Sequence, residues 1–72
     1  MTKVEREKRY LDIVEFIKRY VQDNHVTPTV RELGQAISLS SPSSIHAVLK
    51  QMEKRGMIMS QPDKARTIVV LV

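Results

Sequence analysis

The sequence of 72 residues contains no cysteine, only two glycines and no long apolar run. Without cysteine, a disulfide-stapled secreted scaffold and a thiolate metal site are both excluded. No segment resembles a signal peptide or is long enough to cross a bilayer, so we expect a cytoplasmic protein without membrane contact. A glycine-rich phosphate loop is also missing, and no base accompanies the serines except His46 on the same predicted helix, which argues against an enzyme.

Basic residues outnumber acidic ones, with 12 Lys and Arg against 8 Asp and Glu and a net charge of +4. Such an excess favours a polyanionic partner, because each phosphate contact releases condensed counterions. The excess is informative only if the fold gathers the positive charges on one surface. At this length the chain is expected to form one small domain, residues 1–72, with a modest core.

The first predicted helix covers about residues 5–24. Its apolar residues recur in steps of three and one, the helical period. They are Tyr10, Ile13, Val14, Ile17, Tyr20 and Val21. Asn24-His25 should end this helix, and Thr27 before Pro28 should be extended, because the residue before proline avoids the α region.

Two shorter helices are predicted at about 30–37 and 42–55, with a break at 38–40. Thr29 and Glu32 have the spacing of a capping box before the first of them. Ser41 followed by Pro42 is typical of an N-cap and first helical position, and Gly56 suits the left-handed position after the second. The residues expected to face inward are Val30, Leu33, Ile37, Ile45, Val48, Leu49 and Met52.

The last quarter, residues 57–72, changes to the period of a β-hairpin. Strands are predicted at 57–61 and 67–72, with a loop at 62–66. Ile68, Val70 and Val72 should join Ile58 in the core, which leaves Val69 and Leu71 outside. The predicted fold class is α+β, mainly α: a three-helix winged helix-turn-helix with a C-terminal two-stranded hairpin as the wing.

The first turn of the third helix is small and polar, with Ser41, Ser43, Ser44 and His46. Small side chains allow the backbone to approach a major groove, while hydroxyl and imidazole groups reach base edges. The alternative is that these serines only cap the helix. Basic residues lie at suitable places for phosphate contact, although each alone could be a solvated surface charge.

Four segments resemble the LexA repressors, the SOS-response regulators of bacteria. Residues 27–34 (TPTVRELG) are similar to the PP[ST]xREIG segment of that family, and residues 41–49 (SPSSIHAVL) resemble its recognition helix. Residues 54–58 (KRGMI) are similar to the entry into its wing, and residues 62–68 (PDKARTI) to its wing loop, P-x-K-x-R-x-I. Together they cover nearly the whole chain in the family's order.

The resemblance implies a transcriptional repressor domain that binds a palindromic operator in double-stranded DNA as a dimer. By position, the residues facing bases would be Ser41, Ser43, Ser44, His46 and Ala47. Those facing phosphate would be Arg31, Lys50, Lys54, Lys64 and Arg66. No cofactor is expected, and no metal, because His46 has neither cysteine nor a neighbouring histidine as a partner.

Three departures from the family pattern matter. Ser38 stands where the family usually has glycine, which implies a cost if the turn needs a positive φ. The self-cleaving, dimer-forming domain that follows in LexA proteins is not in this sequence, so an excised domain and a free-standing regulator are both open. Finally, the last strand is apolar on both faces, and Val69 and Leu71 are therefore predicted to form a self-association or partner surface.

The rival interpretation is a small phage or mobile-element winged-helix protein that acts by binding another protein through this apolar strand. The two interpretations differ in the face that drives binding, which is the serine- and histidine-bearing helix for DNA and the last strand for protein. A frayed strand end is the simpler alternative for the strand.

Overall fold

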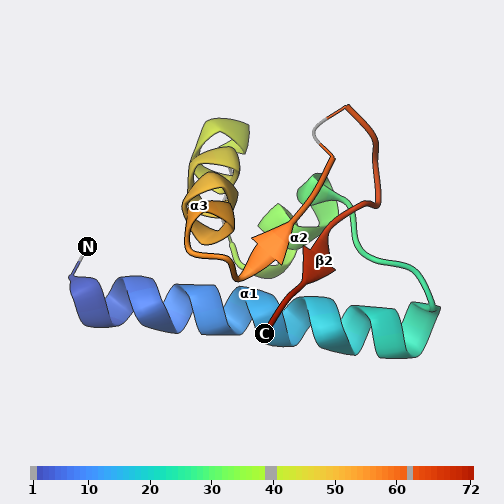
Figure 1. The fold of residues 1–72 in the computed structure, drawn as a ribbon, viewed down its shortest axis with the longest axis horizontal. Helices are drawn as coiled ribbons and strands as arrows, with labels where there is room; N and C mark the ends of the chain where they lie inside the picture. Colours follow the sequence, from blue (N-terminus) through green and yellow to red (C-terminus); the bar gives the residue numbers. More distant parts are fainter. Residues whose placement is uncertain (1, 39–40, 62) are drawn as a thin grey trace.

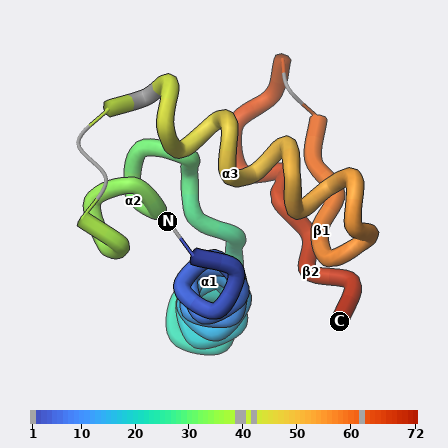
Figure 2. Tube along the Cα trace, turned by 90° about the vertical axis from the view of Figure 1, so that its left-hand side faces the viewer, coloured from blue at the N-terminus to red at the C-terminus, as the bar shows by residue number. Residues whose placement is uncertain are grey.

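Three helices and one hairpin make up the part of the chain that the computed structural model describes, residues 2–38, 41–61 and 63–72. The elements are α1 (Lys3–Asn24), α2 (Val30–Ala36), α3 (Pro42–Lys54), β1 (Ile58–Met59) and β2 (Val69–Val70). The long α1 forms a base, and α2, α3 and the hairpin lie together on one side of it (Figure 1). The view along α1 separates α2 and the hairpin, with α3 passing between them (Figure 2). The predicted fold class is confirmed.

The ends of α1 and α2 follow from their capping residues. Thr2 accepts a hydrogen bond from the Glu5 amide at 3.2 Å, so α1 begins two residues before the predicted start. His25 ends it in the left-handed region with a φ of 63°. The predicted capping box is present, because Thr29 and Glu32 each accept a hydrogen bond from the other's backbone amide, at 3.1 and 2.9 Å.

At the start of α3, Ser41 occupies the N-cap position and Pro42 the first turn, as predicted. The Ser41 carbonyl accepts from the amides of Ser44 and Ile45, but its side chain makes no capping hydrogen bond with the described residues. The hydroxyl of Ser41 is therefore not used to stabilise the helix. Gly56 follows the helix with a φ of 72°, which confirms the left-handed position expected there.

The core lies between α1 and the other elements. The buried residues that form it are Tyr10, Ile13, Val14, Ile17, Leu33, Ile45, Leu49, Met52, Ile58 and Ile68. Around them pack Val30, Ile37, Val48 and Val70, so most of the predicted inward faces are confirmed. Two predictions were wrong: Val21 is 41% exposed near the end of α1, and Val72 is 60% exposed at the end of the chain.

The hairpin is shorter than predicted. Instead of strands at 57–61 and 67–72, only Ile58–Met59 and Val69–Val70 pair, antiparallel, with Ile58 opposite Val70 and Met59 opposite Val69. Toward the loop, a side-chain hydrogen bond replaces backbone pairing. The Thr67 hydroxyl accepts a hydrogen bond from the Gln61 amide at 2.9 Å. As predicted, Val69 and Leu71 are exposed.

The turn between α2 and α3 contains a non-glycine residue with a positive φ. Ser38 has a φ of 61°, so the position where the resembled family usually has glycine does adopt the left-handed conformation. The rest of the predicted break, residues 39–40, and the first residue of the predicted wing loop, residue 62, lie outside the described residues.

Candidate nucleic-acid interface

The residues on the exposed face of α3 are determined by those that it buries in the core. Ile45, Leu49 and Met52 are buried, and the helical period then turns the residues between them toward solvent. The five predicted base-contacting residues are all exposed, and they are Ser41, Ser43, Ser44, His46 and Ala47. The first two turns of α3 thus form a narrow, polar end without large apolar side chains, a shape that suits insertion into a major groove.

The wing is the hairpin of residues 57–72, and hydrogen bonds within it shape its loop. The Lys64 amide donates to the Gln61 carbonyl at 3.1 Å. The Thr67 hydroxyl lies within donating distance of two carbonyl oxygens, those of Gln61 at 3.1 Å and Lys64 at 3.2 Å. These contacts close the base of the loop and leave Lys64 and Ala65 exposed at its end.

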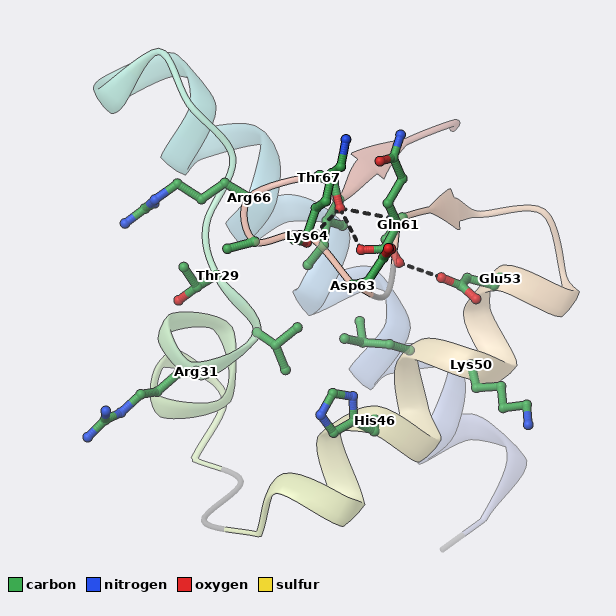
Figure 3. Close-up of a pocket in the computed structure, with 15 residues that line it drawn as sticks. Thr29, Arg31, His46, Lys50, Glu53, Gln61, Asp63, Lys64, Arg66 and Thr67 are labelled. Atoms are coloured by element: carbon green, nitrogen blue, oxygen red, sulfur yellow. Dashed lines mark hydrogen bonds between the residues drawn. The ribbon is translucent and has the colours of Figure 1, made fainter.

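A groove runs between the start of α2, the middle of α3 and the wing, and its volume is about 750 Å³. His46, Leu49, Lys50 and Glu53 line it from α3, and residues 29–31 line it from the start of α2. The wing contributes residues 60–61 and 63–68. In the close-up, His46 extends from α3 toward the space beneath the wing (Figure 3).

Four of the five predicted phosphate-contacting residues line this groove: Arg31, Lys50, Lys64 and Arg66. Arg31 and Lys50 extend outward on opposite sides of it (Figure 3). Lys54 does not line the groove; it is exposed in the last turn of α3. The acidic residues Glu53 and Asp63 also line the groove, so its surface charge is mixed.

Arg66 differs from the other basic residues because it is held by the protein. Its Nη1 atom lies 3.0 Å from Oε1 of Glu32, 3.3 Å from the Tyr20 hydroxyl and 3.2 Å from the Thr27 carbonyl oxygen. Arg66 also has a φ of 57°, in the left-handed region. The guanidinium is therefore turned to the body of the domain, whereas the Lys64 side chain extends in another direction (Figure 3).

Glu32 connects these groups. It accepts from the Thr29 amide at 2.9 Å and from the Tyr20 hydroxyl at 2.8 Å, and it is ion-paired to Arg66. Hydrogen bonding by the Thr29 amide, followed by that of Tyr20, lowers the pKa of Glu32 from 4.5 to about 2. The carboxylate is therefore ionised at neutral pH.

Sequence reasoning found Glu32 only as a capping residue and missed its contacts with Tyr20 and Arg66. Tyr20 was assigned to the apolar face of the first helix, where it is half-buried beside Phe16, with ring centroids 5.9 Å apart. Its hydroxyl reaches a residue 12 positions away, and Arg66 reaches Tyr20 across 46 positions. No local pattern signals contacts of that range.

The tight α2–α3 pair, the exposed polar start of α3 and the basic hairpin beside it define a winged helix-turn-helix domain. The family model described as the LexA DNA binding domain matches residues 5–67. The chain belongs to the LexA DNA-binding domain family, which confirms the resemblance of the four sequence segments.

Curated relatives agree with this assignment. LexA repressors of Bacillus mycoides (strain KBAB4), Bacillus thuringiensis (strain Al Hakam) and Bacillus anthracis are each 45% identical to it over 64 residues. The matched region is 89% of this chain but 31% of each relative, so the chain spans less than a third of their length. Separately, none of the helices in the described part of the chain is long and apolar enough to span a membrane.

Proposed function

We propose that residues 1–72 form one DNA-binding domain that recognises a palindromic operator in double-stranded DNA and represses transcription, one copy on each half-site. The observation that carries this proposal is the exposed polar start of α3 beside a groove lined by Arg31, Lys50 and Lys64. The names of the relatives, which are repressors, support the same function.

In this arrangement α3 enters the major groove. Ser41, Ser43, Ser44 and His46 read base edges, while Ala47 allows close approach. Hydroxyl and imidazole groups both donate and accept hydrogen bonds, so they can match several base edges. Because a major groove is about 12 Å wide, it admits a helix whose leading side chains are small.

The remaining basic residues fix the orientation on the backbone. Arg31 lies in the first turn of α2, Lys50 and Lys54 follow the reading residues along α3, and Lys64 extends from the wing. Contacts of this kind supply affinity without sequence information, and they weaken as salt rises.

The test is fluorescence anisotropy with a LexA-type palindrome and a scrambled duplex over a salt series. We expect a preference for the palindrome that persists at moderate salt and is lost in the double variant Ser43→Ala, His46→Ala. Gln22→Ala, an exposed change on α1, is the control and should keep the preference. Equal binding to both duplexes that disappears with salt would mean general phosphate attraction and would refute base readout.

For the dimer, we propose that two copies associate through the outer face of the hairpin. Met59 and Val69 are directly opposite each other and Leu71 lies two residues further, so the three side chains share one face. They are 58%, 50% and 51% exposed, an apolar surface that a second copy related by a two-fold axis would bury against the same residues.

Sedimentation velocity tests this association. Replacing Val69 by Glu and Leu71 by Lys should convert a dimer into a monomer that keeps its helical circular dichroism. Val4→Glu is the matched control, since Val4 is 79% exposed at the start of α1, far along the chain from the hairpin. An unchanged sedimentation profile in the hairpin variant, or a monomeric parent protein, rejects association through this face.

A further inference from the structure

The β-ladder of the wing is short, although a backbone hydrogen bond from the Leu71 amide to the Met57 carbonyl extends it at 2.8 Å. Its two strands contribute two residues each, and a two-stranded hairpin is at best marginally stable in water. The loop that carries Lys64 extends beyond this short ladder. A defined position for Lys64 therefore requires contacts between the wing and the rest of the domain.

The base of the hairpin is held by Ile58 and Ile68 in the core and by the Ser60 hydroxyl, which donates to Glu53 of α3. The loop beyond it contacts the helical body through Arg66. Its guanidinium reaches Glu32 at the start of α2, the Tyr20 hydroxyl on α1 and the Thr27 carbonyl oxygen in the connecting segment. Its backbone conformation, with a φ of 57°, is one that non-glycine residues adopt only where their surroundings hold them there. The side chains of Arg66 and Glu32 are 43% and 35% exposed, so the cluster is partly shielded from solvent.

We propose that Arg66 is a positioning residue: by its contacts with Glu32 and Tyr20 it sets the distance between the wing and α3, and it does not itself contact phosphate. Lys64 lies two residues before Arg66 and is directed to its place at the groove by this anchor. The inference rests on the proposed DNA binding, and it replaces the direct phosphate contact that the sequence predicted for Arg66.

The decisive variant is Glu32→Gln. An Arg66 that anchors the wing and an Arg66 that contacts phosphate predict changes of opposite sign in the affinity for DNA. Removing a negative charge near DNA should tighten binding if electrostatics alone operates, and it would also free Arg66 for phosphate. If Glu32 anchors the wing, the same change should weaken binding to the palindrome. Glutamine still serves in a capping box, so α2 keeps its N-terminal cap.

The matched control is Glu53→Gln, which removes a negative charge from the same groove without touching Arg66. Glu53 accepts a hydrogen bond from Ser60 of the wing, and the amide oxygen of glutamine can still accept it. We expect Glu53→Gln to leave binding unchanged or tighter. Glu32→Gln and Arg66→Gln should each weaken binding several-fold, to about tenfold, the order of losing one or two backbone contacts. The double variant should be no weaker than the single ones, because both remove the same anchor.

Salt dependence separates the roles further. Lys64→Gln should reduce the slope of log affinity against log salt by about one, as the loss of a phosphate contact does. Arg66→Lys keeps the charge of Arg66 but lacks its planar guanidinium. If Arg66 anchors the wing, this variant should bind DNA as weakly as Arg66→Gln; if Arg66 contacts phosphate, it should bind more tightly than Arg66→Gln. Tighter binding of Glu32→Gln, together with rescue by Arg66→Lys, would overturn the proposal.

A measurement without DNA keeps the inference independent of the proposed function. Hydrogen exchange at the wing amides of Lys64 and Gln61 should be faster in Glu32→Gln and Arg66→Gln than in the parent protein, and unchanged in Glu53→Gln. Unchanged exchange in all variants refutes the anchor even if the parent binds no DNA. Faster exchange with no palindrome preference would leave the anchor standing and refute only the proposed function.

Discussion

Substitutions at two turn residues with nearly the same backbone conformation should change the stability of the fold in opposite directions. Ser38 follows α2 with a φ of 61°, and Gly56 follows α3 with a φ of 72°. An L side chain in this region costs about 1–2 kcal/mol relative to right-handed helix, whereas glycine adopts it without that cost. Ser38→Gly should therefore stabilise the fold, and Gly56→Ala should destabilise it.

The size of each stability change is the difference between the backbone strain of a side chain at positive φ and the conformational entropy that glycine loses on folding. Glycine loses more conformational freedom on folding, which costs about 0.5–1 kcal/mol and offsets part of the relief of strain. A Cβ added at Gly56 meets no atom within 4 Å, so no steric clash adds to the backbone cost there. Each change should therefore shift the free energy of unfolding by about 0.5–1 kcal/mol, in opposite directions.

Thermal unfolding followed by circular dichroism measures both changes. For a chain of this size the expected shifts are about 3–6 °C, upward for Ser38→Gly and downward for Gly56→Ala. Ala36→Gly, an exposed change within α2, is the control for glycine itself and should lower the melting temperature. A melting temperature that falls in Ser38→Gly as much as in Ala36→Gly would refute the strain argument.

Three further predictions concern the core, the groove and pH. Leu33→Ala should cost about 3 kcal/mol in urea unfolding, because Leu33 is fully buried between the helices, and a cost below about 1 kcal/mol would contradict that packing. Lys50→Gln should weaken binding to the palindrome and the scrambled duplex equally; a change in their ratio would mean that Lys50 reads bases. Since the pKa of Glu32 is lowered to about 2 from 4.5, the stability that its ionised form contributes is complete above pH 4.5 and is lost as pH falls toward 2. Glu32→Gln should therefore unfold with a shallower acid dependence, retaining the part due to Glu7, whose pKa Arg55 lowers, and an unchanged acid profile would contradict this assignment.

Helix ends could be predicted because their causes are local. The capping box at Thr29 and Glu32 and the left-handed glycine at position 56 depend on residues within a few positions of one another. The exposed start of α3 followed in the same way, since the helical period that buries Ile45 and Leu49 also exposes Ser44 and His46.

The extent of the hairpin could not be predicted, because an apolar pattern shows which residues suit a strand and not where pairing ends. Residues 67–72 fit a strand throughout, yet Thr67 uses its hydroxyl to close the loop and Val72 is exposed. The contact of Arg66 with Glu32 and Tyr20 could not be predicted from the sequence for a different reason. Tyr20, Glu32 and Arg66 come from three separate elements, and only the packed fold brings them together.

The pairing of Arg66 with Glu32 changes what the net charge of +4 means for DNA binding. These two charges largely neutralise each other, and Glu53 and Asp63 oppose the remaining cations along the groove. The attraction for phosphate then depends on Arg31, Lys50, Lys54 and Lys64, whose effect requires that they match the spacing of the DNA backbone. The placement of these cations therefore matters as well as their number, and the placement of Lys64 is the role that we propose for the ion pair of Arg66 with Glu32, which contributes no net charge. In such a site the acidic residue at the start of α2 supports binding to a polyanion because it fixes the wing that carries the lysine.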